Sequence, residues 1–269
     1  MEGQQILRLL NDPGFIIKAS LGKINGVSVI NKFGHSNDVD TTTDPQDIWG
    51  GAPETFAANG GKYTFSTTAA IDSISSSNSG DTQIVTVVGL DANWEEVIQT
   101  ITLAGQTKVP LTTPLIRVYR MYNSGTVDIA GTVYCYEDTT LSAGVPVDKL
   151  KIRAIIDDGE NQTEMAIYTV PSGCTALFMQ GYVGISRSGA SNVANFTYAV
   201  RPFGEVFQQK GRATCSTQGS NAWIYNYAAY PAIPEKADIK LTCEEVSASG
   251  TGVVGGFDML LFNNAIWGL

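Results

Sequence analysis

Hydrophobic residues in this chain occur in short runs separated by Gly, Ser, Thr, Asn and Asp, a spacing typical of β-structure. The second half of residues 97–103 alternates Gln and Thr with Ile and Leu, the pattern of a strand with one buried and one solvated face. Strands are predicted at residues 83–90, 97–103, 108–111, 116–122 and 131–136, and again at 150–156, 165–170, 176–185, 194–200, 222–227, 239–245 and 255–262.

These strands predict an all-β fold with two antiparallel β-sandwich or jelly-roll-like domains. Tight turns in the first half favour a meander or Greek-key sheet there. Residues 139–147 are rich in turn-forming residues and form the predicted linker. The expected division is an N-terminal arm at 1–27, one sandwich at 28–147 and another at 148–269. No helix longer than a turn or two is expected after the first dozen residues, and the Ser-rich stretch 71–81 is predicted to be a polar loop.

The first residues show a helical pattern. Ile6, Leu9 and Leu10 are spaced roughly as on one face of a helix, and the turn-forming sequence Asn-Asp-Pro-Gly follows at 11–14. A short N-terminal helix or arm is therefore predicted. Either it tethers the chain to a neighbouring subunit, which makes these three side chains interface residues, or it covers the chain's own sheet.

Composition and charge exclude several classes of protein. Charged residues make up 16% of the chain, below the roughly 25% usual in soluble domains. Because 26 acidic residues outnumber 17 basic ones and the net charge is −9, no direct nucleic-acid partner is expected. No apolar run reaches the roughly 18 residues of a membrane helix, and the N-terminus lacks the order of a signal peptide. We expect a soluble, unexported chain with no membrane partner.

The cysteines do not indicate a metal or redox site. The chain has four, at Cys135, Cys174, Cys215 and Cys243, and they are too widely spaced for a CxxC-type motif. In a bacterial cytosol we expect reduced and mostly buried thiols. Pairing of Cys174 with Cys215 across neighbouring strands stays open at this stage.

Catalytic and metal-binding motifs are weak. The single histidine, His35, would have to serve any Ser-His-Asp arrangement, yet no Gly-x-Ser-x-Gly elbow presents a serine. The acidic stretch 38–47 offers oxygen ligands for Ca²⁺, but it lacks the spacing and distal Glu of an EF-hand loop. Asx-turns and a helix cap explain the stretch more simply.

Paired carboxylates are the remaining candidates for chemistry. Glu95-Glu96, Asp157-Asp158 and Glu244-Glu245 are adjacent in sequence, whereas glycoside hydrolysis needs two carboxyl groups about 5 to 9 Å apart around a substrate. Neighbouring residues of a strand point to opposite faces, which weakens each pair. The sequence therefore predicts no enzyme, no cofactor and no metal.

An aromatic stripe lies at residues 223–230. Alternate positions place Trp223, Tyr225 and Tyr227 on one face of a predicted strand. Such a stripe is an aromatic core face or a domain contact, an interface with another subunit, or a platform for a ligand. We take these three residues, with Ile6, Leu9 and Leu10, as the candidate interface set.

Motifs spread along most of the chain resemble those of one known family. They are Ile-Asn-Lys-Phe-Gly at 30–34, Asp-Pro-Gln-Asp-Ile-Trp at 44–49, Val-Gly-Leu-Asp-Ala-Asn-Trp-Glu-Glu at 88–96, Gly-Glu-Asn-Gln at 159–162, Ala-Ile-Tyr-Thr-Val-Pro at 166–171, Val-Arg-Pro-Phe-Gly at 200–204, Ile-Pro-Glu-Lys-Ala-Asp-Ile at 233–239 and Gly-Phe-Asp at 256–258. The set resembles virion structural proteins of tailed bacteriophages, over about residues 28–262. Within it, Arg201 is expected to pair with a carboxylate such as Asp238 or Asp258 and hold adjacent strands in register.

The resemblance implies a non-enzymatic virion protein assembled in the bacterial host cytoplasm. The leading hypothesis is a capsid decoration, cement or head-attached protein that self-assembles as a homo-oligomer, with a trimer favoured. Its partners would be other virion proteins, such as the major capsid, neck or tail proteins. The alternative is a tail or head-fibre protein that binds host surface glycans through loops at one end of a sandwich. A depolymerase or hydrolase would need a deep pocket with His35 or two close carboxylates.

Overall fold

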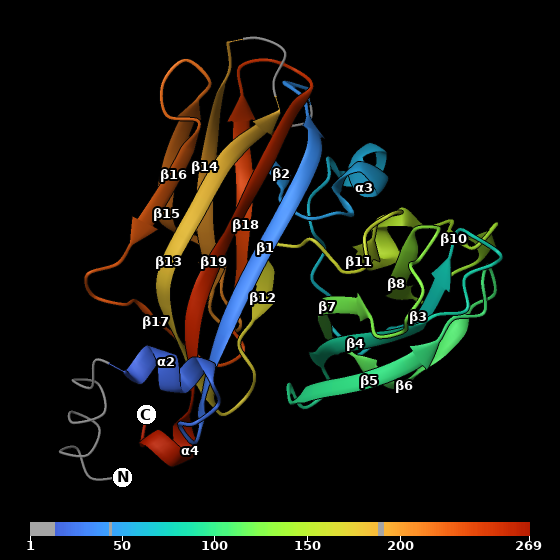
Figure 1. The fold of residues 1–269 in the computed structure, drawn as a ribbon, viewed down its shortest axis with the longest axis horizontal. Coiled ribbons are helices and arrows are strands. Elements are labelled where there is room, and N and C mark those ends of the chain that lie inside the picture. The colour runs from blue at the N-terminus through green and yellow to red at the C-terminus, as the bar shows by residue number, and fades with distance from the viewer. Residues whose placement is uncertain (1–13, 43–44, 188–190) are drawn as a thin grey trace.

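The larger of two β-sandwiches contains the first and the last strands of the chain. A computed structural model describes residues 14–42, 45–187 and 191–269, and Figure 1 shows the larger sandwich on the left. One sheet has the order β1 (Val27–Val39), β19 (Thr251–Asn263), β13 (Cys174–Arg187), β16 (Ala222–Asn226), with β17 (Ala232–Ile233) also on β13. The facing sheet has the order β12 (Ile167–Thr169), β18 (Asp238–Val246), β14 (Val193–Arg201), β15 (Gln208–Ser216), with β2 (Gln46–Asp47) also on β18.

The smaller sandwich lies beside the larger one (Figure 1). Its first sheet has the order β11 (Ile152–Ile156), β8 (Val133–Glu137), β3 (Ile71–Ser76), β6 (Val109–Leu115), and its second has the order β5 (Glu96–Thr102), β4 (Ile84–Leu90), β7 (Arg117–Asn123). The strands of both sandwiches pair antiparallel, and side chains from both small sheets form one apolar core. The predicted all-β class is confirmed. Among the strands longer than two residues, β1, β3 and β15 were not predicted, and β3 lies where a polar loop was expected.

The strand pairing divides the chain differently from the predicted boundaries. β1 pairs with β19 along its length, from Val27 opposite Phe262 to Val39 opposite Thr251. The smaller sandwich is therefore inserted between β2 and β12, so β1 and β2 do not belong with residues 28–147. The predicted linker at 139–147 contains a hairpin of β9 (Leu141–Ser142) and β10 (Val145–Pro146) that precedes the last strand of the small sandwich. Its turn residues gave the same local signal that a linker gives.

Two segments connect the sandwiches and run side by side. The N–H of Gly50 donates to Glu164 O at 2.8 Å, and the N–H of Ala166 donates to Ile48 O at 3.0 Å. Between them Trp49 pairs with Met165, and the Trp49 side chain is only 1% exposed. Because the outgoing and returning chains are bonded to each other, they form one stiff, two-stranded connection.

In the ranges that the structure describes, helices are few and short. They are α2 (Phe15–Ser20), α3 (Ala52–Asn59), α4 (Asn264–Trp267) and a 3₁₀ turn η1 (Lys149–Lys151). Within the described ranges no helix is long and apolar enough to cross a membrane. The eight residues of α3 exceed what the sequence led us to expect. Its local signals were present, since Pro53 lies in the first turn and Gly60, with φ of 73°, ends the helix.

The described part of the N-terminal segment packs on its own chain. Phe15 of α2 lies 6.5 Å from the ring of Phe262 and 6.5 Å from that of Trp267, so α2 and α4 cover one end of the larger sandwich together (Figure 1). The predicted helix that carries Ile6, Leu9 and Leu10 lies outside the described residues. Its proposed contact with a neighbouring subunit stays a prediction.

A buried ion pair joins the two sandwiches. Arg117 of β7 donates from Nε to Asp238 Oδ1 at 2.8 Å and from Nη2 to Oδ2 at 3.0 Å. Arg201 of β14 donates from Nε to Asp238 Oδ2 at 3.1 Å, which confirms the predicted pairing of Arg201 with Asp238. Thr169 adds a hydrogen bond to Oδ1 at 2.6 Å. The Arg117 and Asp238 side chains are 5% and 4% exposed, so each charge depends on the other for compensation.

Alternate residues of β7 make further contacts outside their own sheet. The ring of Tyr119 lies 4.8 Å from that of Tyr168 on β12. Its carbonyl accepts a hydrogen bond from the ammonium of Lys32, which is buried on β1. Two residues on, the N–H of Met121 donates to Thr163 Oγ1 at 3.1 Å. The smaller sandwich thus docks through β7 onto the β1 and β12 edge of the larger one.

Replacing Asp238 by Asn should weaken this docking strongly, because it leaves the buried Arg117 charge unbalanced. We expect the free energy of unfolding, measured by urea denaturation, to fall by about 3–5 kcal/mol. Asp138→Asn is the matched control, since Asp138 pairs with Lys108 at the surface with side-chain exposures of 60% and 42%. Equal stability losses in the two variants would contradict a structural role for the buried cluster.

Burial of Lys32 should make stability depend on pH. Desolvation, followed by repulsion from Arg120, lowers the Lys32 pKa from 10.5 to about 7. Between these values the unfolded chain holds a proton that the folded chain has released, so stability rises with pH in this window; below it both states are protonated and the whole cost applies. Relative to Lys32→Met, the wild type should gain up to about 1.4 kcal/mol per pH unit in urea denaturation across the window. A stability difference that stays constant with pH would disprove the assignment.

Candidate functional site

The two strands at the free edge of the larger sandwich carry the predicted aromatic stripe. β15 and β16 end their sheets, and in the described part of the chain each has a strand partner on one side only. We call this region the aromatic edge and define it as Trp223, Tyr225, Tyr227, Lys210 and Arg212. The opposite edge of the same sandwich, formed by β1 and β12, is the one that the smaller sandwich covers.

The three aromatic residues share a face, as alternation predicted. Trp223 and Tyr225 stack with ring centroids 5.2 Å apart and an interplanar angle of 6°, and Tyr225 meets Tyr227 edge-on at 4.6 Å. Tyr227 in turn contacts Phe178 inside the sandwich at 5.4 Å. Trp223 and Tyr227 pack partly on the core, while Tyr225 is 43% exposed. The stripe therefore contacts the core through Trp223 and Tyr227 and is open to solvent at Tyr225.

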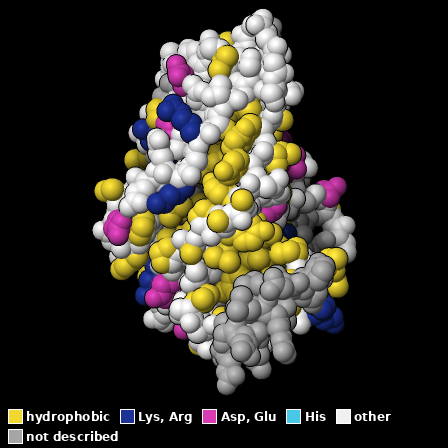
Figure 2. All heavy atoms as spheres, turned by 90° about the vertical axis from the view of Figure 1, so that its left-hand side faces the viewer, with side chains coloured by type: hydrophobic (Ala, Val, Ile, Leu, Met, Phe, Trp, Pro, Cys, Tyr) yellow, Lys and Arg dark blue, Asp and Glu magenta, His cyan; other side chains and the backbone are white. Residues whose placement is uncertain are grey.

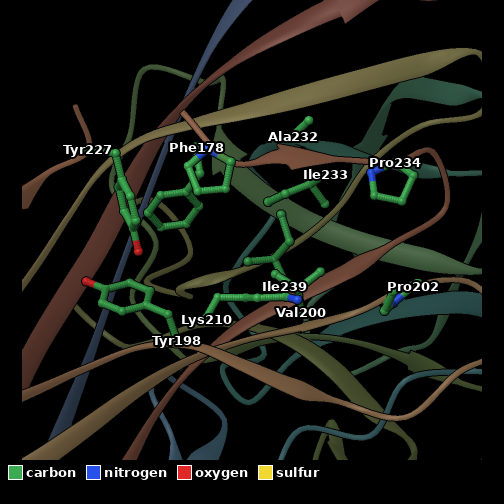
Figure 3. A pocket seen from close by; sticks show the side chains of 11 residues that line it. Phe178, Tyr198, Val200, Pro202, Lys210, Tyr227, Ala232, Ile233, Pro234 and Ile239 are labelled. Atoms are coloured by element: carbon green, nitrogen blue, oxygen red, sulfur yellow. The ribbon is translucent and has the colours of Figure 1, made fainter. Parts of the chain in front are cut away.

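Two hollows open between β15 and the strands opposite. A groove of about 260 Å³ has Trp223, Tyr225 and Tyr227 on one wall and Lys210 and Arg212 on the other. A narrower slot of about 140 Å³ continues into the apolar core. Figure 3 shows the hydroxyl ends of Tyr198 and Tyr227 at one end of the slot and Pro202 and Pro234 at the other.

A glycine makes room for the groove. A Cβ atom at Gly181 would lie 2.6 Å from the Tyr198 ring. That ring cannot move aside easily, because the Tyr198 hydroxyl is bonded to Tyr182 O at 2.9 Å and to Gly256 O at 3.0 Å. The floor of the groove is thus set by a residue without a side chain beside an anchored tyrosine.

The aromatic edge continues onto an exposed apolar surface. Ile224, on the outer face of β16, is 66% exposed, and Tyr230 is 45% exposed. Phe203 and Val206, in the loop between β14 and β15, are 63% and 76% exposed. Figure 2 looks onto the side of the molecule that lies on the left in Figure 1, where β15 and β16 are, and shows hydrophobic side chains gathered in a band across it, with Lys and Arg side chains beside the band. Such a patch is characteristic of an interaction surface.

A third hollow lies at the junction of the two sandwiches. This interdomain cavity, of about 350 Å³, is lined by Phe65, Ser66, Thr67, Trp94, Arg117, Arg201, Pro202, Phe203, Gly204, Glu205, Lys236 and Asp238. Its cations lie over aromatic rings: Arg117 is 4.8 Å from the Trp94 ring centroid and Arg201 is 4.9 Å from that of Phe65. Sequence reasoning placed Trp94 in a turn and Arg201 in an ion pair, but nothing local indicated that they share a cavity.

His35 has two neighbours that the sequence did not indicate. Its Nε2 lies 3.4 Å from Ser186 Oγ, and its Nδ1 lies 3.5 Å from Glu164 Oε2. The order Ser-His-Glu is that of a hydrolytic triad, yet the hollows described above are not lined by His35. Ser186 lies in β13 at a point where its register with β19 shifts, and the N–H of the preceding Ile185 is already used, since it donates to Asn221 O at 2.9 Å. A nucleophilic serine also needs free donors for the developing oxyanion.

The predicted metal and carboxylate candidates are dispersed. Asp47 is buried and accepts from Lys240, Thr242 and the N–H of Tyr63. Asp40 accepts from the N–H of Gly250 at 2.7 Å, and Asp44 lies outside the described residues. Across residues 14–42, 45–187 and 191–269, no three His, Cys, Asp or Glu side chains are grouped to hold a metal ion.

Asp157 and the four cysteines are the remaining titratable candidates for chemistry. Burial and then the charge of Glu164 raise the pKa of Asp157 to about 6. All four cysteines lie in the described part of the chain and none is bonded to another; three are buried and Cys174 is partly exposed, which confirms that the thiols are mostly buried. Burial raises the Cys135 pKa to about 12, so this thiol is unreactive at neutral pH.

Comparisons with known proteins are sparse. No protein-family model matches the chain, and no curated protein sequence matches it. Among solved structures, that of infectious bursal disease virus Gt strain is 12% identical, covers 90% of this chain and 73% of its own, and gives a TM-score of 0.24. The VP2 subviral particle of the same virus is 11% identical, with coverages of 89% and 77% and a TM-score of 0.18. These TM-scores are too low to indicate a shared fold.

Ser186 should not behave as a catalytic nucleophile. We expect a fluorophosphonate probe to label the wild type no more than Ser186→Ala, as measured by intact-protein mass spectrometry, because a strand serine with long contacts to His35 lacks an oxyanion site. Stoichiometric labelling that disappears in both Ser186→Ala and His35→Ala would contradict this and would make the chain a hydrolase.

Proposed function

We propose that this chain is a non-enzymatic virion structural protein that assembles through its aromatic edge. The sequence motifs that resemble virion structural proteins of tailed bacteriophages support this role, as does the all-β architecture. The observation that carries the proposal is the exposed aromatic edge, where β15 and β16 leave both sheets of the larger sandwich open. Such edges associate with other chains unless something covers them.

The chemistry of this edge suits a protein partner. Tyr and Trp are enriched at interfaces because they combine a large apolar surface with a polar group. Lys210 and Arg212 line the groove in a chain whose net charge is −9. Acidic side chains outnumber basic ones in the chain, so an acidic site on a second copy would be attracted by these cations.

The location we propose is the outside of the particle. A strongly acidic chain is repelled by packaged nucleic acid, whereas a capsid decoration, cement or head-attached protein does not touch it. The partners would be the major capsid, neck or tail proteins and further copies of the same chain. A trimer is the favoured assembly, because one edge that meets a different surface on the next copy closes into a ring.

Charge placed on the edge should prevent self-association. Ile224→Asp is expected to shift the chain toward monomer and raise the dissociation constant at least about tenfold, since a carboxylate at a buried contact costs 1.4 kcal/mol or more. Light scattering coupled to size-exclusion chromatography measures the mass. Electron microscopy of particles incubated with the variant then measures binding to the outer capsid surface, which should also be lost.

Ile98→Asp is the matched control. Ile98 lies in β5, also an edge strand, and is 65% exposed against 66% for Ile224. It should leave mass and capsid binding unchanged. A wild type that stays monomeric at high concentration and does not bind particles would refute the proposed function, and equal effects of the two substitutions would refute the edge as its site.

A further inference from the structure

Two turns at the interdomain cavity have bulky residues at positions of positive φ, where glycine is usual. In the described chain, three residues other than glycine have positive φ: Trp94 at 65°, Lys236 at 60° and Ala143 at 49°. Trp94 and Lys236 come from different sandwiches, yet both line this cavity. Strained backbone of this kind persists at ligand sites, where the side chain is needed in spite of its cost.

Trp94 ends the loop of the β4–β5 hairpin. The N–H of Asp91 donates to Glu95 O at 3.0 Å, and the N–H of Trp94 donates to Asp91 O at 3.0 Å. In such three-residue loops the last position is left-handed and usually holds glycine. Here it holds an indole that meets Phe203 edge-on at 5.5 Å, and the Trp94 carbonyl accepts from the N–H of Ser172 in the larger sandwich at 2.8 Å.

Lys236 occupies the third position of the turn before β18. The N–H of Ala237 bonds to Pro234 O at 3.4 Å, and a positive φ at the third position is ordinarily supplied by Gly or Asn. The Lys236 ammonium lies 5.8 Å from the Phe203 ring centroid and, among the described residues, donates no hydrogen bond. A cation is thus held at the cavity with its donors available.

The charge balance of the cavity fits one negative charge. Its ionisable lining is Arg117, Arg201, Lys236, Asp238 and Glu205. Three cations against two carboxylates leave a surplus of one positive charge, which suits a monoanion and not a nucleic acid. Arg201 uses Nε and Nη2 on Asp238, so Nη1 remains for a ligand in the described structure.

The size and walls of the cavity fit a ring. Its volume of about 350 Å³ is at the lower end of the roughly 300–1,000 Å³ of small-molecule pockets, which often lie between domains. The Phe203 ring, which is 63% exposed and lies beside the edge-on indole of Trp94, supplies flat apolar surface for a sugar's C–H groups. We propose that the interdomain cavity binds one acidic monosaccharide unit, with its carboxylate at Lys236 and Arg201 and its ring against Trp94 and Phe203.

The cavity shares Phe203 with the apolar surface beside the aromatic edge, but it is lined by none of the residues that define that edge. The experiment is isothermal titration calorimetry of the full chain with methyl glucuronide and with the methyl glycoside of N-acetylneuraminate, against methyl glucoside and acetate. At least one acidic sugar should bind about tenfold more tightly than either comparator, because each comparator lacks the charge or the ring. The Ile224→Asp variant should bind it equally, so failure of assembly and failure of binding are distinguishable.

Lys236→Asn tests the residue itself, because Asn tolerates positive φ but carries no charge. We expect its melting temperature to equal or exceed that of the wild type and its affinity for the acidic sugar to fall about tenfold. Lys62→Asn, at an exposed lysine that does not line the cavity, should change neither. The proposal is overturned if no acidic sugar binds, if glucoside or acetate binds as well, or if Lys236→Asn keeps full affinity.

Discussion

The carboxylate of Asp238 is the interaction on which the arrangement of this molecule depends. Arg117 reaches it from the smaller sandwich, while Arg201 and Thr169 reach it from neighbouring strands of its own sheet. A buried carboxylate is tolerated only when its charge and its lone pairs are all satisfied. Since those partners come from both sandwiches, the buried charge of Arg117 is balanced and the hydrogen bonds of Asp238 are complete only when the two are docked. The same bonds fix the guanidinium groups that form the wall of the interdomain cavity.

Docking at one edge leaves the other edge of the larger sandwich open. The smaller sandwich covers β1 and β12 through Lys32, Tyr119 and Tyr168, so the strand edge on that side is covered by the chain itself. On the other side β15 and β16 remain, with stacked aromatic rings and two cations. The charges of Lys210 and Arg212 oppose strand addition, but the exposed aromatic ring of Tyr225 and the exposed Ile224 leave apolar surface that solubility alone does not require. The contrast between a covered edge and an open edge with exposed aromatic side chains is the physical basis for the proposal that this protein assembles.

Local sequence pattern predicted the strands but not their partners. Period-2 alternation located β5 and set Trp223, Tyr225 and Tyr227 on one face, because both depend on neighbouring residues alone. The pairing of β1 with β19 joins the two ends of the chain, so no local signal could assign β1 to its domain. The prediction of a linker at residues 139–147 was wrong for a related reason, since a tight hairpin and a flexible linker use the same turn-forming residues. The helix α3 could have been found from its Pro and Gly caps.

The candidate sites also differ in whether local sequence could predict them. Chemistry that lies along one strand was predictable, whereas the cavity and the His35 contacts bring together residues from distant segments. What does mark the cavity is a departure from local rules: Trp94 and Lys236 stand where turn geometry favours glycine. Sequences agree with their fold at nearly every level, and exceptions concentrate where a side chain serves something other than folding. Two such exceptions, contributed by separate sandwiches and meeting at one charged hollow, are therefore better explained by a ligand than by packing.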